Sequence, residues 1–178
     1  MAKSSVIVVG ESRLAEELIG VAHAADYDAK LFRDTDAAAI SASLIIDTTC
    51  GDETKKRETV KKLDAGSPSS VLLTSCLGFS TTRIAAWTSK PERVVGFATF
   101  YPIKDKKVVE LSPGLRTGDA AVTAAENLFR TLGKEPRRAK DAPGLVFPRI
   151  LSLIVNEAAR EAVAEAKSAK DSKDTAAV

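Results

Sequence analysis

The opening stretch of the chain constrains the fold most, because a strand pattern changes directly into a helix pattern at a glycine. Val6–Val9 is a short β-branched run that stops at Gly10, and apolar residues recur at helical spacing from Leu14 onward. A glycine in such a turn lets the backbone approach a phosphate, and the N-terminus of the following helix offers free N–H groups and a positive dipole end. The stretch therefore predicts the start of a βαβ unit that binds a nucleotide.

The glycine motif of this turn is incomplete. The pattern G-x-G-x-x-G would put glycine at three positions, where the chain has Gly10, Ser12 and Ala15. Ser12 and Ala15 are small enough to let the helix pack closely on the strand. Glu11 brings a negative charge to the place where a pyrophosphate would lie, and Arg13 can offset that charge.

Composition places the chain among ordinary globular proteins. Its 178 residues are 44% hydrophobic and 28% charged, which predicts one domain with a full core and an appended element. The net charge of +2 gives no basis for binding nucleic acid or an anionic membrane. No apolar run approaches the ~18 residues of a membrane span, and Met1–Ser5 lacks the apolar region of a signal peptide. We therefore expect a cytoplasmic protein without a membrane partner.

The two cysteines, Cys50 and Cys76, are too few for the disulfide framework of a secreted protein. Each follows a predicted strand, so the two thiols would lie close together if those strands are neighbours. They are then either a redox pair or ordinary, partly buried thiols. Asp47 and Asp52 have no histidine near them in sequence, and we expect no metal site there.

Strand patterns alternate with helix patterns along most of the chain. The predicted strands are Ser5–Val9, Ala29–Phe32, Ser43–Asp47, Val71–Thr74, Val94–Phe100, Val108–Leu111 and Glu135–Arg138. The predicted helices are Ser12–Ala24, Asp52–Leu63, Ser80–Trp87 and Asp119–Leu132, with a short helix or turn at Asp36–Ile40. This alternation predicts the α/β class, with a doubly wound, mostly parallel sheet and crossover helices.

The last part of the sequence has a different character. Val146–Lys167 reads as one long helix with a broad apolar surface. We expect three parts: a nucleotide-binding domain at 4–142, a C-terminal helix at 143–168 and a disordered tail at 169–178. The apolar residues between 146 and 168 either fold back onto the chain's own sheet or contact another subunit or a separate domain.

Three segments resemble a known family. Gly96–Pro102 reads G-F-A-T-F-Y-P, Val108–Glu110 reads V-V-E, and Lys140–Arg149 reads K-D-A-P-G-L-V-F-P-R. Their order and spacing resemble the 3-hydroxyacyl-CoA dehydrogenase family, which has G-x-H-F-F-N-P, L-V-E and K-D-x-P-G-F-x-x-N-R. The resemblance covers roughly residues 5 to 165. It implies a Rossmann-type NAD-binding domain, followed in the family by a helical domain that dimerises and helps to hold the acyl-CoA.

The resemblance also implies a catalytic site, which is altered here. In the family, a glutamate orients a histidine that acts as the general base. Glu110 stands at the glutamate position, but Ala98 stands at the histidine position. The family's serine and asparagine positions hold Leu77 and Pro148. Another base would have to come from elsewhere, and the two candidates are Tyr101 in the nearby loop and His23 in the first helix.

The cofactor positions that match the family are better kept. At the end of the second strand, an acidic residue would bind the ribose hydroxyls of NAD, but Arg33 stands there. Arg33 favours the 2′-phosphate of NADP, or it is a surface residue in a site whose NAD affinity has declined. The expected cofactor-binding residues are Gly10, Glu11, Ser12, Arg13, Leu14, Arg33, Thr48, Lys56 and Ser75.

Two classes of function remain open. The first is an NAD(P)-dependent oxidoreductase acting on a 3-hydroxyacyl-CoA such as 3-hydroxybutyryl-CoA, impaired by the loss of the histidine. The second is a non-catalytic module that senses a nucleotide or supports assembly, keeping the fold and an oligomer interface.

Overall fold

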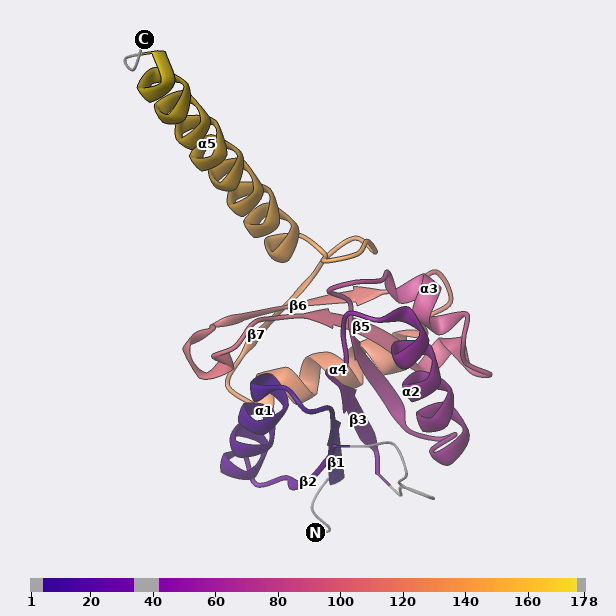
Figure 1. Cartoon of the computed structure of the whole chain (residues 1–178). Helices are drawn as coiled ribbons and strands as arrows, with labels where there is room; N and C mark the ends of the chain where they lie inside the picture. Colours follow the sequence, from indigo (N-terminus) through magenta and orange to yellow (C-terminus); the bar gives the residue numbers. More distant parts are fainter. Residues whose placement is uncertain (1–4, 34–41, 176–178) are drawn as a thin grey trace. The chain divides into compact units, whose positions relative to one another are not determined.

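The computed structural model describes the backbone of residues 5–33 and 42–175, with side chains as far as residue 167. The chain divides into two units, Met1–Leu145 and Val146–Val178. The first unit contains a twisted sheet with helices on both faces (Figure 1). This arrangement is the α/β fold that the sequence predicts. The predicted turn at Asp36–Ile40 lies outside the described residues.

The sheet of the first unit is parallel except at one pairing. Its strands are β1 (Ser5–Val9), β2 (Asp28–Phe32), β3 (Leu44–Asp47), β4 (Val71–Ser75), β5 (Val94–Ala98), β6 (Val108–Pro113) and β7 (Glu135–Arg138). They lie in the order β2-β1-β3-β4-β5-β6-β7. Strand β6 is antiparallel to β5, and β7 is parallel to β6. Along the chain the order reverses at β1, so a topological switch point lies between β1 and β3.

Two helices cover each face of the sheet. The helices are α1 (Arg13–Ala24), α2 (Glu53–Gly66), α3 (Thr81–Ala85) and α4 (Asp119–Thr131), with 3₁₀ turns η1 (Pro91–Arg93) and η2 (Ile103–Asp105). One core cluster joins α1 and α4 to the sheet, and the other joins α2 and α3 to the opposite face. The N-terminus of α1 is capped by Ser12, whose side chain accepts a hydrogen bond from Ala15 N. The N-terminus of α2 is capped by Asp52, which accepts one from Lys55 N.

Several element boundaries differ from the sequence prediction. Strand β5 ends at Ala98 rather than Phe100, and α3 is shorter than Ser80–Trp87. The second unit is one helix, α5 (Phe147–Thr175), which continues past the predicted end at Lys167 into the predicted tail. Its later residues are rich in alanine and lysine, which favour the helix even without a packing partner. Within the described residues, no helix is both long and apolar enough to cross a membrane.

A buried ion pair anchors α2 to the turn before β5. Arg93 donates to Asp64 Oδ1 at 2.5 Å and to the carbonyl oxygens of Ser67 and Ser70 at 2.9 and 2.7 Å. Ser89 N donates to the other oxygen of Asp64 at 2.8 Å. Burial alone would raise the pKa of Asp64, but hydrogen bonds from Ser89 and the Arg93 guanidinium together hold this pKa below its ordinary value.

Acid is expected to weaken this anchor. Because the folded-state pKa of Asp64 lies below 3.8, the ionised carboxylate stabilises the fold above that pH, and this contribution disappears as the pH falls through the folded-state pKa. Between about pH 5 and pH 2, the free energy of unfolding should fall more steeply for the unmodified chain than for Asp64→Asn. Urea unfolding across this range measures both slopes, and equal slopes would contradict the prediction.

Candidate functional site

The turn after β1 lies at the topological switch point and needs a glycine. Gly10 has a φ of 135°, and a Cβ built on it would overlap with Thr48 Oγ1. Its N–H donates to Phe32 O of β2 at 3.0 Å. The turn is therefore fixed between the ends of β2 and β3, where open α/β sheets bind their ligands.

Replacing Gly10 with alanine is expected to destabilise the fold by about 1–3 kcal/mol, because the positive φ and the overlap with Thr48 both oppose a side chain. Chemical unfolding measures this loss. The double variant Gly10→Ala/Thr48→Ala should recover only part of it, since the second change removes the overlap but not the backbone strain. An alanine variant as stable as the unmodified chain would refute this account.

Hydroxyl groups tie the loops after β1 and β3 together. Thr48 Oγ1 donates to Val9 O at 2.9 Å, and Ser12 Oγ donates to Thr48 Oγ1 at 3.4 Å. Ser12 Oγ also accepts from Ala15 N as the helix cap. As at any helix N-terminus, the first N–H groups of α1 are not needed by the helix's own hydrogen bonds and can bind an anion. The turn thus keeps the geometry that can accept a phosphate.

The predicted cofactor residues divide into an exposed and a buried group. The exposed ones are Glu11, Ser12, Arg13 and Arg33. The buried ones are Gly10, Leu14, Thr48, Lys56 and Ser75. Of the exposed charges, Glu11 pairs with Lys55 at 3.7 Å and Arg33 pairs with Glu16 at 3.0 Å. The structure therefore brings the Gly10 turn (residues 10–12), Arg13 and Arg33 to the carboxyl edge of the sheet. The remaining predicted cofactor residues lie in the interior and support this edge.

Lys56 has a structural environment that sequence reasoning missed. Its side chain is 1% exposed, and its ammonium donates to Asp47 Oδ2 at 2.6 Å and to Thr49 O at 2.7 Å. Asp47 also accepts hydrogen bonds from Thr49 N at 2.9 Å and Thr74 Oγ1 at 2.8 Å. Lys56 thus fixes the loop after β3 by hydrogen bonds from the interior. An aspartate at the end of an otherwise apolar strand was the sequence signal for such a buried partner.

The two positions that match the family's catalytic pair face each other across β5 and β6. Ala98 and Glu110 are register partners in this antiparallel pairing. Directly opposite residues have Cβ atoms about 4.5–5.5 Å apart, so a side chain on residue 98 would be within reach of the Glu110 carboxylate. Ala98 is 3% exposed and ends in a methyl group, which cannot take up a proton. The geometry of the pair is present, but its base is not.

Neither alternative base replaces the missing histidine in this place. His23, which is the one histidine of the chain, lies near the C-terminal end of α1, where Nε2 bonds to Ala29 O at 2.8 Å. Ala29 is the second residue of β2, so His23 lies at the amino end of the strands, opposite the carboxyl end where the candidate site is. Tyr101 lies at the correct edge and is 49% exposed, with its ring against Arg13. Because Tyr101 is half exposed, its position suits a contact with Arg13 rather than acid–base catalysis in a buried site.

The K-D-x-P-G segment closes the first unit against α3. Asp141 accepts hydrogen bonds from Thr81 N at 2.7 Å and Thr82 N at 2.9 Å, so it caps α3 from 60 residues away. Gly144 N donates to Cys76 O at 2.6 Å. This segment therefore fixes the loop after β4, which carries Leu77 at the position of the family's serine. Pro148, at the asparagine position, belongs to α5 and the second unit.

The two cysteines have different environments. Cys50 is exposed, whereas Cys76 is buried with its Sγ 3.2 Å from Thr81 Oγ1, and both are free thiols. Burial raises the pKa of Cys76 to about 11, which is the opposite of what a reactive thiol requires. These surroundings favour ordinary thiols over a redox pair. In the part of the chain that the structure describes, no group of three metal-ligating side chains is found.

The fold and this edge define the chain as a Rossmann-type dinucleotide-binding protein. Residues 12–142 match the family model described as 3-hydroxyacyl-CoA dehydrogenase, NAD binding domain. The chain therefore belongs to the 3-hydroxyacyl-CoA dehydrogenase family.

Individual relatives agree with this assignment. A 3-hydroxybutyryl-CoA dehydrogenase of Bradyrhizobium diazoefficiens is 34% identical over 116 residues, which are 65% of this chain and 40% of the relative. Among solved structures, the (S)-3-hydroxybutyryl-CoA dehydrogenase of Ralstonia eutropha superposes with a TM-score of 0.78 at 22% identity, covering 88% of this chain and 70% of that one. FadB2 of M. tuberculosis gives a TM-score of 0.81 at 22% identity, covering 93% and 73%. These two structures confirm the fold.

Proposed function

We propose that the chain is an NAD(P)-binding member of this family whose ancestral reaction, on a 3-hydroxyacyl-CoA such as 3-hydroxybutyryl-CoA, is impaired by the loss of the general base. The observation that carries this proposal is the register pairing of Ala98 with Glu110. A bound nicotinamide supplies the hydride acceptor for such a reaction. The chain lacks the imidazole that would remove the hydroxyl proton, and losing a general base typically costs about 10²–10⁴-fold in rate.

The choice between NAD and NADP rests on Arg33. This residue follows β2 and is exposed, and among the described side chains it pairs with Glu16, which is also exposed. Surface ion pairs of this kind contribute little, so a 2′-phosphate can compete with Glu16 for the guanidinium. We propose that Arg33 makes NADP at least as good a ligand as NAD. The edge of the sheet where the cofactor would bind is lined by Gly10, Glu11, Ser12 and Arg13. It is supported from the interior by Leu14, Thr48, Lys56 and Ser75.

A second candidate function is a non-catalytic module that senses a nucleotide or supports assembly. Two observations favour it: the empty base position at Ala98, and the apolar side chains of α5. Among the described residues of its own unit, α5 is the one element of secondary structure. The large apolar residues of the segment are Val146, Phe147, Ile150, Leu151, Leu153, Ile154, Val155 and Val163. We propose that residues 146–168 contact another subunit, either a second copy or a separate helical partner.

Two further parts of the proposal concern the location of the protein in the cell and the binding of acyl-CoA. Cys50 is an exposed free thiol, which persists in the reducing cytoplasm, and we place the protein there. The chain spans 40% of the length of its Bradyrhizobium relative. Acyl-CoA binding by this chain is therefore proposed together with the partner that would contact α5.

Cofactor titration followed by a turnover assay tests these proposals. NADH and NADPH are added separately, and quenching of Trp87 or the reduced-cofactor fluorescence reports binding. Reduction of acetoacetyl-CoA is then followed by the loss of reduced cofactor. Binding with turnover near background is the expected result, with NADPH binding at least as tightly as NADH. Rapid turnover would overturn the assignment of Ala98, and an absence of binding would overturn the cofactor proposal.

A further inference from the structure

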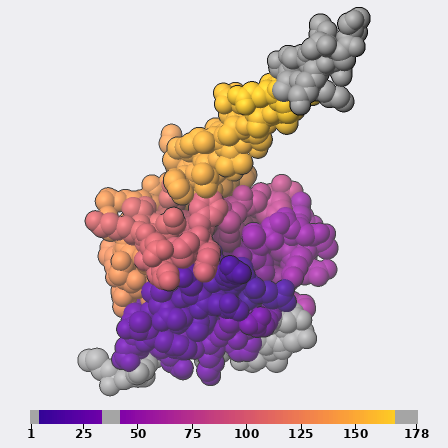
Figure 2. Space-filling model, turned by 60° about the vertical axis from the view of Figure 1, so that its left-hand side comes forward, coloured from indigo at the N-terminus to yellow at the C-terminus, as the bar shows by residue number. Residues whose placement is uncertain are grey.

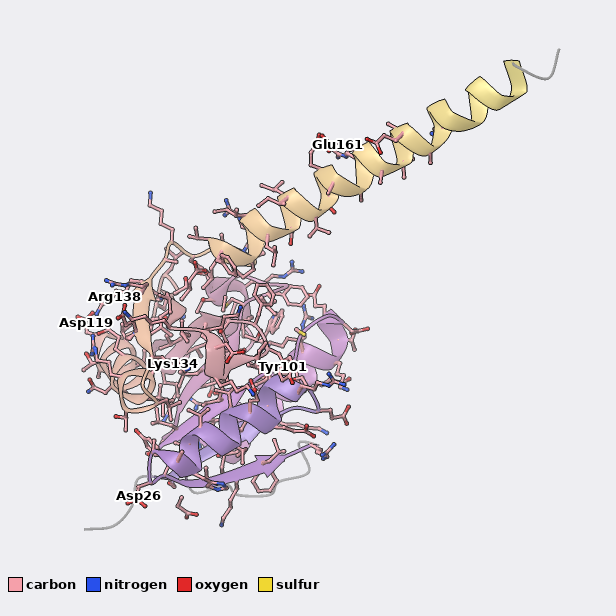
Figure 3. The ribbon with its side chains drawn as sticks, turned by 90° about the vertical axis from the view of Figure 1, so that its left-hand side faces the viewer. Asp26, Tyr101, Asp119, Lys134, Arg138 and Glu161 are labelled. Atoms are coloured by element: carbon pink, nitrogen blue, oxygen red, sulfur yellow. The ribbon has the colours of Figure 1, made fainter. Side chains whose placement is uncertain are left out.

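Arg13 and Tyr101 form a contact at the edge where the cofactor is proposed to bind. Arg13 is the first residue of α1, and its guanidinium carbon lies 5.8 Å from the centroid of the Tyr101 ring. Side chains of a helix lean toward its N-terminus, which places the guanidinium beside the Gly10 turn. Figure 3 shows Tyr101 at one end of α1 and Asp26, which follows this helix, at the other.

The loop that carries Tyr101 is fixed on both sides. Ile103 N donates to Glu17 Oε2 of α1 at 2.5 Å, and Lys134 donates to Ile103 O at 2.7 Å and Lys104 O at 3.2 Å. Ile103 itself is fully buried. The space-filling view shows this segment lying against the N-terminal part of the chain (Figure 2). Tyr101 is therefore held near α1, because Glu17 of α1 and Lys134, which directly precedes β7, both anchor the residues that follow it.

The carboxylates that the structure describes near Arg13 do not form ion pairs with it. The nearby carboxylates have other partners: Glu11 pairs with Lys55, Glu16 with Arg33, and Glu17 with Ile103 N. Among the described residues, no carboxylate forms an ion pair with Arg13. The contact with Tyr101 is a cation–π contact, and such a contact leaves N–H groups of the guanidinium able to donate hydrogen bonds.

We propose that Tyr101 positions Arg13 to bind the diphosphate of the dinucleotide at the Gly10 turn. The proposal rests on the proposed cofactor binding and adds its mode. Where a complete glycine motif brings the backbone itself to the phosphates, Ser12 and Ala15 carry side chains here. A guanidinium held at the helix N-terminus supplies positive charge and paired N–H donors that match a phosphate group. Arg13 is the binding residue, and Tyr101 is a positioning residue.

Four variants of the full chain test this proposal by NADH titration. Arg13→Ala should raise the Kd about tenfold, which is the loss expected for one charge-assisted hydrogen bond. Tyr101→Ala should raise the Kd about 2–5-fold, whereas Tyr101→Phe, which keeps the ring, should stay within about twofold of the unmodified chain. Arg116→Ala removes another exposed arginine, distant in sequence from the turn, and should leave the Kd unchanged.

Two further measurements separate positioning from a merely structural effect. In the Arg13→Ala background, Tyr101→Ala should add no further loss, because the group that it positions is already gone. The salt dependence of the NADH Kd should also become shallower in Arg13→Ala, since one phosphate contact is lost. Tight binding by Arg13→Ala, or equal losses for Tyr101→Phe and Tyr101→Ala, would overturn the proposal. If the unmodified chain binds neither NADH nor NADPH, the proposed function itself fails.

Discussion

Placing histidine at residue 98 is expected to raise the rate of acetoacetyl-CoA reduction by about 10²–10⁴-fold over the unmodified chain. The reason is geometric: residue 98 faces Glu110 across β5 and β6, so an imidazole there gains a carboxylate to orient it. The rate should also acquire a dependence on pH near the ordinary imidazole pKa of about 6.5. Initial rates with NADH or NADPH, measured from pH 5 to about pH 9, check both expectations.

Two control variants distinguish proton transfer from a change of shape. Ala98→Gln adds a polar side chain of similar reach that cannot act as a base, and it should leave the rate near background. Ala98→His/Glu110→Gln keeps the imidazole without its carboxylate and should lose part of the gain. Because Ala98 is 3% exposed, the larger side chain will cost stability, about 1–3 kcal/mol, which chemical unfolding measures separately. A folded Ala98→His protein that binds cofactor but shows no gain in rate would refute this account of residue 98.

Much of the fold was predictable because its signals are local. Short apolar runs predicted strands such as β1, β4 and β5 within a few residues, and Ser12 and Asp52, the first residues of two predicted helices, are the caps of α1 and α2. The later part of α5 was predicted wrongly as a tail. Its small and charged residues have no apolar pattern, yet alanine and lysine have a high helix propensity. Propensity without periodicity is a weak signal in a single sequence.

The candidate site was predictable only where one residue acts alone. Gly10 and the position of Ala98 opposite Glu110 could be inferred from spacing in the sequence. The partners of Lys56, the cap that Asp141 forms on α3 and the contact of Arg13 with Tyr101 could not. Each of these depends on residues that are distant in sequence and meet only after the sheet has formed. Burial could not be predicted either: Lys56 matches a cofactor position, and its ammonium donates to Asp47 and Thr49 in the interior.

The second large effect concerns the buried ion pair between Asp47, at the end of β3, and Lys56 of α2. Replacing Asp47 with asparagine should lower the free energy of unfolding by about 3–5 kcal/mol, because Lys56 is 1% exposed and would keep a buried, unpaired charge. Urea unfolding measures this loss. Glu53, which pairs with Arg57 and Arg83 near the surface, gives a control, and Glu53→Gln should change the free energy of unfolding by no more than about 1 kcal/mol.

The two partners of this buried pair are not expected to be equivalent. Without Lys56, Asp47 still accepts hydrogen bonds from Thr49 and Thr74, whereas without the Asp47 charge, Lys56 keeps only Thr49 O among its described partners. Lys56→Met should therefore cost less than Asp47→Asn, and the double variant should recover much of the loss of Asp47→Asn, since no buried charge then remains. A double variant as unstable as Asp47→Asn would show that packing, rather than the unpaired ammonium, sets the cost. This pair holds the loop whose Thr48 lies against Gly10. The same series of variants therefore measures how much the pair stabilises the candidate nucleotide-binding site.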